Sequence, residues 1–295
     1  MSETRCGFAA LVGRANVGKS TLLNALIGEK LSIVTPRPQT TRHRVLGVLN
    51  TEHAQIAFLD TPGLHRGAKR ALNRAMNRTA GAALAEADVC VLVVEAGRWT
   101  AEDEHTLARI RESERPCVVA VNKLDSVRPR ERLLPYLARI AEHTGDAELV
   151  PVSALKSENL SALLAAIERH LPLSPLLFPP EQRTDRDINF RIAEVIREKL
   201  TLALSQELPY GIAVEIEQAV EEDGQLNVSA AIWVDREGHK PIVIGAKGEL
   251  LKRIGRSARL ELNRLLGRRL HLALWVKVRE GWADNARALK QLGLE

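Results

Sequence analysis

The chemistry-bearing residues with the clearest spacing run from Gly13 to Ser20, which read GRANVGKS and are followed by Thr21. The run FAALV before them is typical of a strand, and TLLNALIG after them has helical spacing. Glycines at such a turn let backbone N–H groups surround phosphate oxygens at the positive end of the following helix. The segment therefore predicts a phosphate-binding loop whose nucleotide contacts come from Gly13, Arg14, Ala15, Asn16, Val17, Gly18, Lys19, Ser20 and Thr21.

The side chains expected to meet the phosphates and a magnesium ion come from three segments. Lys19 supplies a positive charge and Ser20 a hydroxyl ligand for Mg²⁺. About forty residues later, the strand-like run QIAFLD ends in the tetrapeptide Asp60, Thr61, Pro62 and Gly63. We expect the Asp60 carboxylate to hold Mg²⁺ through water and the Gly63 N–H to meet the γ-phosphate. Taken alone, this tetrapeptide also fits an ordinary turn.

A polar segment, PRPQTTRHR at residues 36–44, lies between the first helical pattern and the second strand-like run. It contains neither an acidic residue nor a glycine, a composition that favours ordering by a bound ligand. One of its two threonines should reach Mg²⁺ and the γ-phosphate, and its position favours Thr41 over Thr40. The predicted metal ligands are therefore Ser20, Thr41 and Asp60.

Two further loops, each following a strand-like run, predict that the base is guanine. In the loop after CVVAV, Asp125 can accept hydrogen bonds from the guanine N1–H and exocyclic amine, a donor pair that adenine lacks. Lys123 can lie against the base, and Asn122 can brace the loops. After ELVPV, the Ala154 N–H can meet the guanine carbonyl. The predicted contacts are Asn122, Lys123, Asp125, Ser153, Ala154 and Leu155. A metabolic P-loop kinase is disfavoured, because no site for an acceptor substrate is evident.

Length and composition indicate two domains in a reducing compartment. The 295 residues exceed the usual size of one compact domain, and 45% are apolar. The three cysteines have no paired short spacing and are expected to be reduced core residues. The N-terminal residues MSETRC give no sign of a signal peptide, and no apolar run approaches the length of a membrane span. We therefore expect a cytoplasmic protein.

Apolar runs alternate with helical patterns up to about residue 171, which predicts an α/β domain with a mostly parallel sheet. The expected strands are FAALV, VLGVL, QIAFLD, VCVLVVE, CVVAVN and ELVPVS. A proline-rich segment near residues 172–184 then indicates a boundary. We predict a P-loop GTPase domain at 1–175, a linker at 176–184, and a smaller α+β RNA-binding domain at 185–295.

The second domain has the pattern helix, strand, strand, short strand, helix, strand, in which PIVI is the short strand. The sequence GAKG after PIVI has the GXXG form of a KH loop, which grips the backbone of single-stranded RNA. Eight basic and two acidic residues lie between positions 247 and 269. A plain strand-to-helix turn is the alternative for GXXG alone. The predicted RNA contacts are Gly245, Ala246, Lys247, Gly248, Lys252, Arg253 and Arg256.

Apolar and aromatic residues of this domain leave the role of the bases open. Ile242, Ile244 and Ile254 fit either a floor for bases or simple core positions. Trp275 alternates with core positions and is expected to pack inside, whereas Trp282 is open to either role. Because aromatic residues make up only 3% of the chain, phosphate contacts rather than stacking should supply most of the RNA affinity.

With these motifs in place, the chain resembles the Era family of bacterial ribosome-assembly GTPases over essentially its whole length. The resemblance rests on GRANVGKST, PQTTRHR, DTPGLH, WTAEDE, NKLD, ELPYGIAVEIE, VIGAKG and LWVKVREGWAD. It implies a Ras-like GTPase domain joined to a type II KH domain, with GTP, GDP and Mg²⁺ as ligands. It also implies binding to the 3′ end of 16S ribosomal RNA, maturation of the small ribosomal subunit, and a monomer. Some members contact the inner membrane peripherally. This chain has Ala15 where the family commonly has proline.

The hydrolytic step is the least determined part of the sequence. Leu64 occupies the position where Ras-like GTPases have a glutamine that orients the attacking water. Our hypothesis is that the Asn16 oxygen holds a potassium ion against the phosphates; the alternative is that Asn16 only stabilises the loop. The predicted catalytic residues are Asn16, Lys19, Thr41 and Gly63. Two functions remain open: a GTP-hydrolysing switch, and an RNA-binding assembly chaperone for which GTP is chiefly an allosteric ligand.

Overall fold

The computed structural model describes residues 4–63, 70–204 and 208–294. Contacts between Cα atoms divide the chain into two compact units. The first unit comprises Met1–Ser32, Thr41–Lys69 and Asn73–Asp185, and the second Ile33–Thr40, Arg70–Leu72 and Arg186–Glu295. The predicted domain limits at 175 and 185 remain predictions. The short segment Ile33–Thr40, which precedes the expected metal ligand Thr41, belongs with the C-terminal residues.

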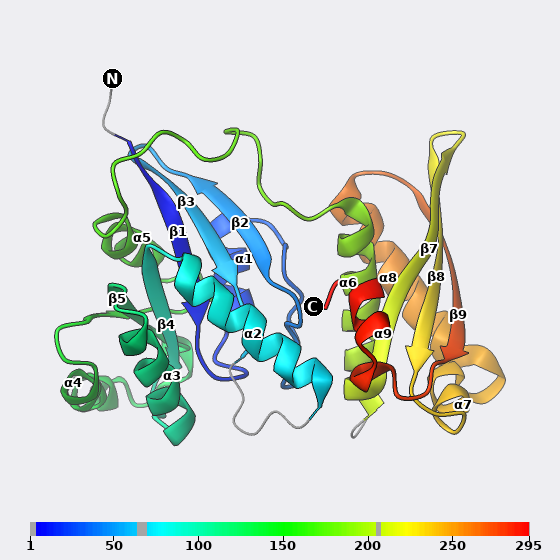
Figure 1. Cartoon of the computed structure of the whole chain (residues 1–295), viewed down its shortest axis with the longest axis horizontal. Helices are drawn as coiled ribbons and strands as arrows, with labels where there is room; N and C mark the ends of the chain where they lie inside the picture. The colour runs from blue at the N-terminus through cyan, green and yellow to red at the C-terminus, as the bar shows by residue number, and fades with distance from the viewer. Residues whose placement is uncertain (1–3, 64–69, 205–207, 295) are drawn as a thin grey trace. The chain divides into compact units, whose positions relative to one another are not determined.

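The first unit contains a six-stranded sheet in the order β2-β3-β1-β4-β5-β6 (Figure 1). Every neighbouring pair is parallel except β2 and β3, so the predicted α/β fold with a mostly parallel sheet is confirmed. The strands are β1 (Arg5–Val12), β2 (Val45–Asn50), β3 (Ala54–Asp60), β4 (Val89–Glu95), β5 (Cys117–Asn122) and β6 (Glu148–Pro151). They coincide with the six apolar runs of the sequence.

Among the described residues of this unit, five α-helices connect and cover the strands (Figure 1). They are α1 (Lys19–Ile27), α2 (Ala71–Glu86), α3 (Ala101–Glu112), α4 (Leu133–Thr144) and α5 (Leu160–Glu168). Alternate strand residues such as Val12 and Leu92 pack against Leu107 of α3 and Ile140 of α4 in one buried cluster. Short 3-10 turns, η1 (Leu124–Ser126) and η2 (Arg130–Arg132), follow β5. Parallel strands buried under helices require the near-continuous apolar runs that made them recognisable.

The proline-rich segment after α5 is held to the sheet by one buried side chain. Gln55 of β3 is fully buried, and its Oε1 accepts hydrogen bonds from the N–H groups of Leu177 and Phe178, each at 2.9 Å. Its Nε2 donates to the carbonyl oxygen of Phe178 at 2.8 Å. The Phe178 ring also meets Phe8 edge-on, with 6.1 Å between ring centroids. Within the predicted linker at 176–184, Leu177 and Phe178 are thus attached to the sheet.

The cysteines are free thiols, as predicted. Cys90 and Cys117 lie opposite each other on neighbouring parallel strands. Burial raises the pKa of Cys90 to about 11 and that of Cys117 to about 12, so both are protonated at neutral pH. Because the thiolate is the reactive form, these thiols act as small core side chains.

The second unit is an α+β fold with a three-stranded sheet in the order β7-β8-β9 (Figure 1). The strands are β7 (Ile212–Glu222), β8 (Gln225–Val234) and β9 (Leu270–Val278); β7 pairs antiparallel and β9 parallel with β8. Helices α6 (Ile188–Ala203) and α8 (Glu249–Leu266) bury Ile196 and Leu262 in one cluster with strand residues such as Ile232. Smaller elements are η3 (Leu208–Gly211), α7 (His239–Ile244), η4 (Ala246–Gly248), η5 (Trp282–Asp284) and α9 (Ala286–Gln291).

The expected short strand at PIVI is wrong: these residues form the end of helix α7. Pro241 lacks an N–H, so it fits the first turn of a helix, where that group has no partner. The Gly245 N–H donates to the Pro241 carbonyl at 2.8 Å and ends the helix. Val243 is fully buried in the core of the unit, and this packing overrides the strand preference of the β-branched residues.

The aromatic and isoleucine side chains of this unit divide between core and surface. Trp282 is 1% exposed, and its indole N–H donates to the Gly211 carbonyl at 3.1 Å, so it is a core residue. Trp275 is only half-buried, less than we expected. Ile254 belongs to the core cluster, whereas Ile242 is exposed. Among the described residues, no helix combines the length and apolar composition that crossing a membrane requires.

We predict that Gln55→Leu releases the proline-rich segment while leaving the sheet in place. The N–H groups of Leu177 and Phe178 would lose their Gln55 acceptor, at a cost of about 0.5–1.5 kcal/mol for each hydrogen bond. Hydrogen exchange of a peptide covering residues 172–184 should become at least about tenfold faster. Gln218→Leu, an exposed position on β7, is the matched control. Unchanged exchange in the Gln55 variant would contradict the anchoring role.

Candidate nucleotide site and nucleic-acid interface

The predicted nucleotide residues converge because they follow parallel strands. The phosphate-binding loop follows β1, Asp60 ends β3, Asn122 ends β5, and Ser153 follows β6. Parallel neighbours end at the same edge of a sheet, so segments up to 140 residues apart in the sequence meet there. Loops at this edge are the usual ligand-binding position in open α/β sheets.

The phosphate-binding loop has the backbone that its glycines suggested. Gly18 has φ 101°, a left-handed conformation, and a Cβ atom there would lie 2.4 Å from the Asn122 Nδ2. Only glycine therefore permits Asn122 to approach and donate to the Val17 carbonyl at 2.9 Å. Helix α1 begins at Lys19, so its N-terminal N–H groups face the loop, as an anion site requires.

Lys19 is buried at the centre of this loop. Its Nζ donates to the carbonyl oxygens of Gly13 at 2.9 Å and Arg14 at 3.0 Å. Burial lowers the pKa of Lys19 to about 8, although the nearby Asp60 carboxylate opposes that shift. A buried ammonium that donates its hydrogen bonds to neutral carbonyl oxygens remains short of negative charge. Phosphate oxygens would supply it.

The three predicted metal ligands lie together. The Ser20 hydroxyl donates to Asp60 Oδ2 and lies beside the Thr41 hydroxyl, both at 2.7 Å, and Thr41 Oγ1 is 3.4 Å from Asp60 Oδ2. Asp60 Oδ1 is buried and has no hydrogen-bond partner among the described residues. Burial raises the pKa of Asp60, which indicates a carboxylate in need of a cation. Two hydroxyls and a carboxylate are oxygen ligands of the kind that Mg²⁺ prefers, so the set fits this metal.

The neighbouring threonine is directed elsewhere. Thr40 Oγ1 donates to the Arg37 carbonyl and lies beside the Thr35 hydroxyl, both at 2.6 Å. The structure thus brings Thr41, and not Thr40, to Ser20 and Asp60. This is the arrangement that the position of the two threonines favoured.

The segment after Asp60 packs against the phosphate-binding loop. The Thr61 hydroxyl donates to the Leu11 carbonyl at 2.9 Å, which ties the end of β3 to β1. A Cβ atom on Gly63 would lie 3.1 Å from the Ala15 N, so the backbone of Gly63 borders the loop closely. The predicted departure at Leu64 lies outside the described residues.

The base-selecting loops are braced by Asn122 and Ser153. Asn122 Nδ2 reaches the phosphate-binding loop, while its Oδ1 accepts from the Ala154 N–H at 3.0 Å. The Ser153 hydroxyl donates to Asp125 Oδ1 and orients the carboxylate expected to select guanine. Ala154 therefore differs from expectation, because its N–H is used inside the protein rather than directed to a guanine carbonyl. Leu155 is 71% exposed.

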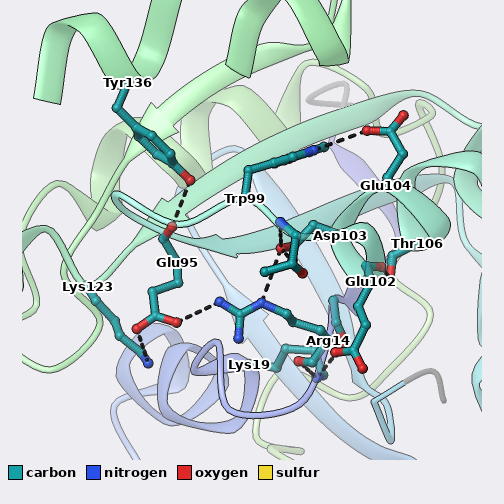
Figure 2. Close-up of polar contacts among 12 residues, drawn as sticks. Arg14, Lys19, Glu95, Trp99, Glu102, Asp103, Glu104, Thr106, Lys123 and Tyr136 are labelled. Carbon is teal, nitrogen blue, oxygen red and sulfur yellow. Dashed lines mark hydrogen bonds and ion pairs between the residues drawn. The ribbon is translucent and has the colours of Figure 1, made fainter. Parts of the chain in front are cut away.

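Sequence reasoning missed a cluster of charges behind the loops (Figure 2). Arg14 does not point toward a nucleotide: its guanidinium donates to Glu95 at 2.6 Å and to Asp103 at 3.2 Å. The second oxygen of Glu95 accepts from Lys123 Nζ at 3.0 Å. Glu95 ends the run VCVLVVE, which we used to predict a strand, and Asp103 lies in WTAEDE, which we used to recognise the family. The available signal was an acidic residue at the end of a strand, Glu95, and another in the first turn of a helix, Asp103.

The second unit presents two hollows beside the start of α8. A Cβ atom on Gly245, where φ is 76°, would lie 2.5 Å from the Leu250 Cβ, so glycine is needed for this loop to close on the helix. One hollow, of about 440 Å³, is lined by Gly248, Leu251, Lys252, Gly255, Arg256, Arg259, His271, Leu272 and Leu274. The other, of about 590 Å³, is lined by Ala246, Glu249, Leu250, Lys252, Arg253 and Arg256.

These hollows combine apolar walls with cations. Leu251 of α8 and Leu272 and Leu274 of the edge strand β9 give the first hollow an apolar side, and its basic residues come from α8. Apolar surface suits the faces of bases, and Lys and Arg suit phosphates. The sequence named Lys252 and Arg256 but not the β9 side. The helical spacing of 248, 252, 255, 256 and 259 could have indicated the face of α8; the strand opposite it is a tertiary feature.

The fold and these two sites define the class of the protein, a P-loop GTPase with a C-terminal KH domain. The sequence profile described as "50S ribosome-binding GTPase" matches residues 8–123, and the KH domain profile matches residues 207–283. The chain is 50% identical over 292 residues to the GTPase Era of Marinobacter nauticus, covering 99% of this chain and 96% of the relative. It is 45% identical to GTPase Era of Coxiella burnetii over the whole of both chains. The chain belongs to the Era family of GTPases.

Solved structures agree with this assignment. A crystal structure of Aquifex aeolicus Era, in a variant bound to GDP and AlF4⁻, superimposes with a TM-score of 0.96 at 41% identity and 99% coverage of both chains. An Era structure in complex with MgGDPNP and nucleotides 1506–1542 of 16S ribosomal RNA gives the same TM-score, identity and coverage. A guanine nucleotide is bound in both relatives, and magnesium and RNA are bound in one of them.

The lowered pKa of Lys19 predicts that GDP binding takes up a proton in mildly alkaline solution. Phosphates should raise the pKa again, so the lysine that is neutral above about pH 8 in the free protein becomes charged in the complex. At about pH 8.5 the uptake should be roughly 0.7 proton, and affinity should fall as pH rises further. Calorimetry in two buffers of different ionisation enthalpy measures it. Lys19→Arg, which does not titrate here, should show none; equal uptake by both proteins would refute the assignment.

Proposed function

We propose that this GTPase is a switch whose nucleotide state sets how its KH domain engages 16S ribosomal RNA near the 3′ end, in assembly of the small ribosomal subunit. The Era relative solved with nucleotides 1506–1542 of 16S ribosomal RNA supports the choice of RNA. The apolar and basic hollows beside α8 support single-stranded RNA as its form.

The nucleotide contacts follow the chemistry of each loop. Lys19 and the loop from Gly13 to Thr21 bind the phosphates, and Gly63 borders the γ-phosphate. Ser20, Thr41 and Asp60 hold Mg²⁺, which neutralises charge on the phosphates. Asp125, oriented by Ser153, selects guanine, and Lys123 covers the base.

The observation that carries the switch is the contact made by Ile33–Thr40 within the second unit. Arg197 of α6 is buried, forms a two-pronged ion pair with Glu194, and donates to the Thr40 carbonyl. On the same helix, Glu198 accepts from the Val34 N–H at 2.9 Å. The residue that follows Thr40 in the chain is Thr41, a proposed metal ligand.

A KH-domain helix thus holds the peptide that precedes a proposed metal ligand. If the γ-phosphate draws Thr41 toward the metal site, Thr40 has to move with it. Loss of the γ-phosphate would let both residues return. Nucleotide and RNA would then influence each other's binding by the same factor.

The route of hydrolysis rests on Asn16. This residue is exposed in the phosphate-binding loop with φ 64°, a conformation that asparagine tolerates better than most residues. Its amide oxygen would hold a potassium ion, which would supply positive charge against the negative charge that develops during phosphoryl transfer. Lys19, Thr41 and Gly63 complete the catalytic set.

Further properties of the proposed function concern the cell. The protein works in the cytoplasm as a monomer, with peripheral contact at the inner membrane in some conditions, as the family resemblance implies. The GTPase domain extends over 1–175 and the KH domain over 185–295. Each of these stays a prediction.

We predict that an RNA oligonucleotide of the 16S 3′ end binds with affinities that differ at least about fivefold between the complexes with GDP and with a non-hydrolysable GTP analogue. Fluorescence anisotropy measures both affinities. Arg197→Gln should bring the two affinities together, because it removes the hold on Thr40. A difference of no more than about twofold in the unmodified protein would favour the chaperone, in which hydrolysis is incidental.

The same assay tests the proposed RNA site with one variant in the GXXG loop and one control variant outside it. Lys247, exposed in the GXXG loop, is changed to Glu, which should abolish measurable binding and leave GDP affinity unchanged. Glu237→Lys alters an exposed charge outside both hollows and should bind RNA normally. Intact RNA binding by Lys247→Glu would show that RNA binds elsewhere.

We predict that turnover of GTP is roughly tenfold or more faster in potassium chloride than in sodium chloride at equal ionic strength. Asn16→Ala should lose this difference while retaining GDP affinity to within about threefold, because the loop N–H groups and Lys19 remain. Phosphate release measures turnover. Equal rates in the two salts, with Asn16→Ala unchanged, would leave Asn16 as a residue that only stabilises the loop.

A further inference from the structure

One carboxylate connects the phosphate-binding loop with the loop proposed to select the base (Figure 2). Glu95 is the last residue of β4. Its Oε2 accepts from Arg14 in the phosphate-binding loop at 2.6 Å, and its Oε1 accepts from Lys123 in the base-selecting loop at 3.0 Å. Arg14 and Lys123 are 109 positions apart in the sequence, so a shared partner is what brings them together.

The Arg14 side of this connection is rigid. The Arg14 side chain is 8% exposed, and its Nε donates to Asp103, which is fully buried. Asp103 also accepts from the N–H and hydroxyl of Thr100 at 2.9 and 2.8 Å, which caps helix α3. The carbonyl of Arg14 in turn accepts from Lys19. The guanidinium therefore fixes the loop that presents Lys19.

The backbone of Glu95 is fixed as well. Its carbonyl accepts from the Tyr136 hydroxyl of α4 at 2.8 Å. The next residue, Ala96, donates its N–H to the Asn122 carbonyl at 2.7 Å, directly before Lys123. Because the Glu95 carbonyl and the Ala96 N–H are both hydrogen-bonded, the backbone at Glu95 is held, and its carboxylate can fix the position of Lys123.

We infer that Glu95 is a positioning residue for guanine nucleotide binding, which acts by holding Lys123 at a set place relative to the phosphate-binding loop. This inference rests on the proposed nucleotide site. A nucleotide has a fixed span from base to phosphates, so loops set at the matching separation bind it without further ordering. Glu95 touches neither the metal ligands nor the γ-phosphate region, so GTP and GDP should depend on it equally.

The charges explain why the carboxylate cannot be replaced by its amide. Arg14 and Lys123 are both cations, and both lie within hydrogen-bond distance of the same carboxylate. Without the negative charge they would repel each other. Arg14 is retained by Asp103, whereas Lys123 has 32% of its side chain exposed and is free to turn toward solvent. In the absence of the Glu95 charge, Lys123 would therefore leave the position from which it is proposed to cover the base.

The experiment compares Glu95→Gln with the unmodified protein in GTP turnover and in GDP binding. We expect KM for GTP and Kd for GDP to rise by the same factor, about tenfold, with kcat within about twofold. The matched control is Glu104→Gln on α3, because Glu104 accepts from Trp99 and pairs with His143 but contacts no nucleotide loop. The control should leave all three constants unchanged.

A double-mutant cycle with Lys123→Met tests the route. If Glu95 acts through Lys123, adding Glu95→Gln to Lys123→Met should weaken GDP binding by less than about twofold more. Additive losses would overturn this route, as would a Glu95→Gln variant with unchanged KM and Kd or with a loss confined to kcat. If the unmodified protein and Glu104→Gln both fail to bind GDP, the proposed nucleotide site itself is wrong, which separates the two failures.

Discussion

The burial of a lysine ammonium at the end of β1 is the constraint on which the rest of the first unit depends. The hydrogen bonds of the Lys19 ammonium go to carbonyl oxygens, and burial lowers its pKa to about 8 although the Asp60 carboxylate lies nearby. Such a group is costly without an anion. The loop leads into the N-terminus of α1, and beside it, at the end of β3, lies the Asp60 carboxylate, one oxygen of which has no hydrogen-bond partner among the described residues. The site is thus assembled with both a cation in need of phosphate and an anion in need of metal, and a magnesium–nucleotide complex supplies both at once.

These opposite charges are held in place because the surrounding loops are braced by hydrogen bonds and ion pairs within the protein. Asn122 connects the Val17 carbonyl with the Ala154 N–H, and Glu95 connects Arg14 with Lys123. Each brace links loops from different strands. Because Asn122 and Glu95 each bind residues of two loops, a distortion of one loop should change the positions of the others. A preorganised site loses less conformational freedom on binding, which increases affinity without any additional contact to the ligand.

How far the sequence could predict this site depended on whether the information was local. Gly13 to Ser20, Asp60 to Gly63, and Asp125 each carry their chemistry within a few residues, and the apolar runs located all six strands of the sheet. The pairing of Arg14 with Glu95 and Asp103 joins residues 81 and 89 positions apart, and it depends on which strands become neighbours. Helix α7 was missed for a related reason: the β-branched residues Ile242, Val243 and Ile244 have strand preferences, and the buried contacts of Val243 override them. The Ala154 N–H was assigned to a ligand because its competing acceptor, Asn122, lies on another loop.

In the second unit, the proposed RNA-binding residues are spread over a surface rather than concentrated in a buried cavity. Its basic residues lie on exposed turns of α8, where each phosphate contact is weak and screened by salt. Specific control of such a surface has to come from how the domain is held. The residues that could transmit that control are few: Arg197 and Glu198 grip the backbone of Thr40 and Val34, and one peptide bond separates Thr40 from Thr41. Because Arg197 is buried and already paired with Glu194, its hold on the Thr40 carbonyl has little freedom to adjust. A movement of Thr41 toward a γ-phosphate would therefore have to be accommodated by the helix or by the loss of that hydrogen bond, and either outcome would carry the state of the nucleotide into the KH domain.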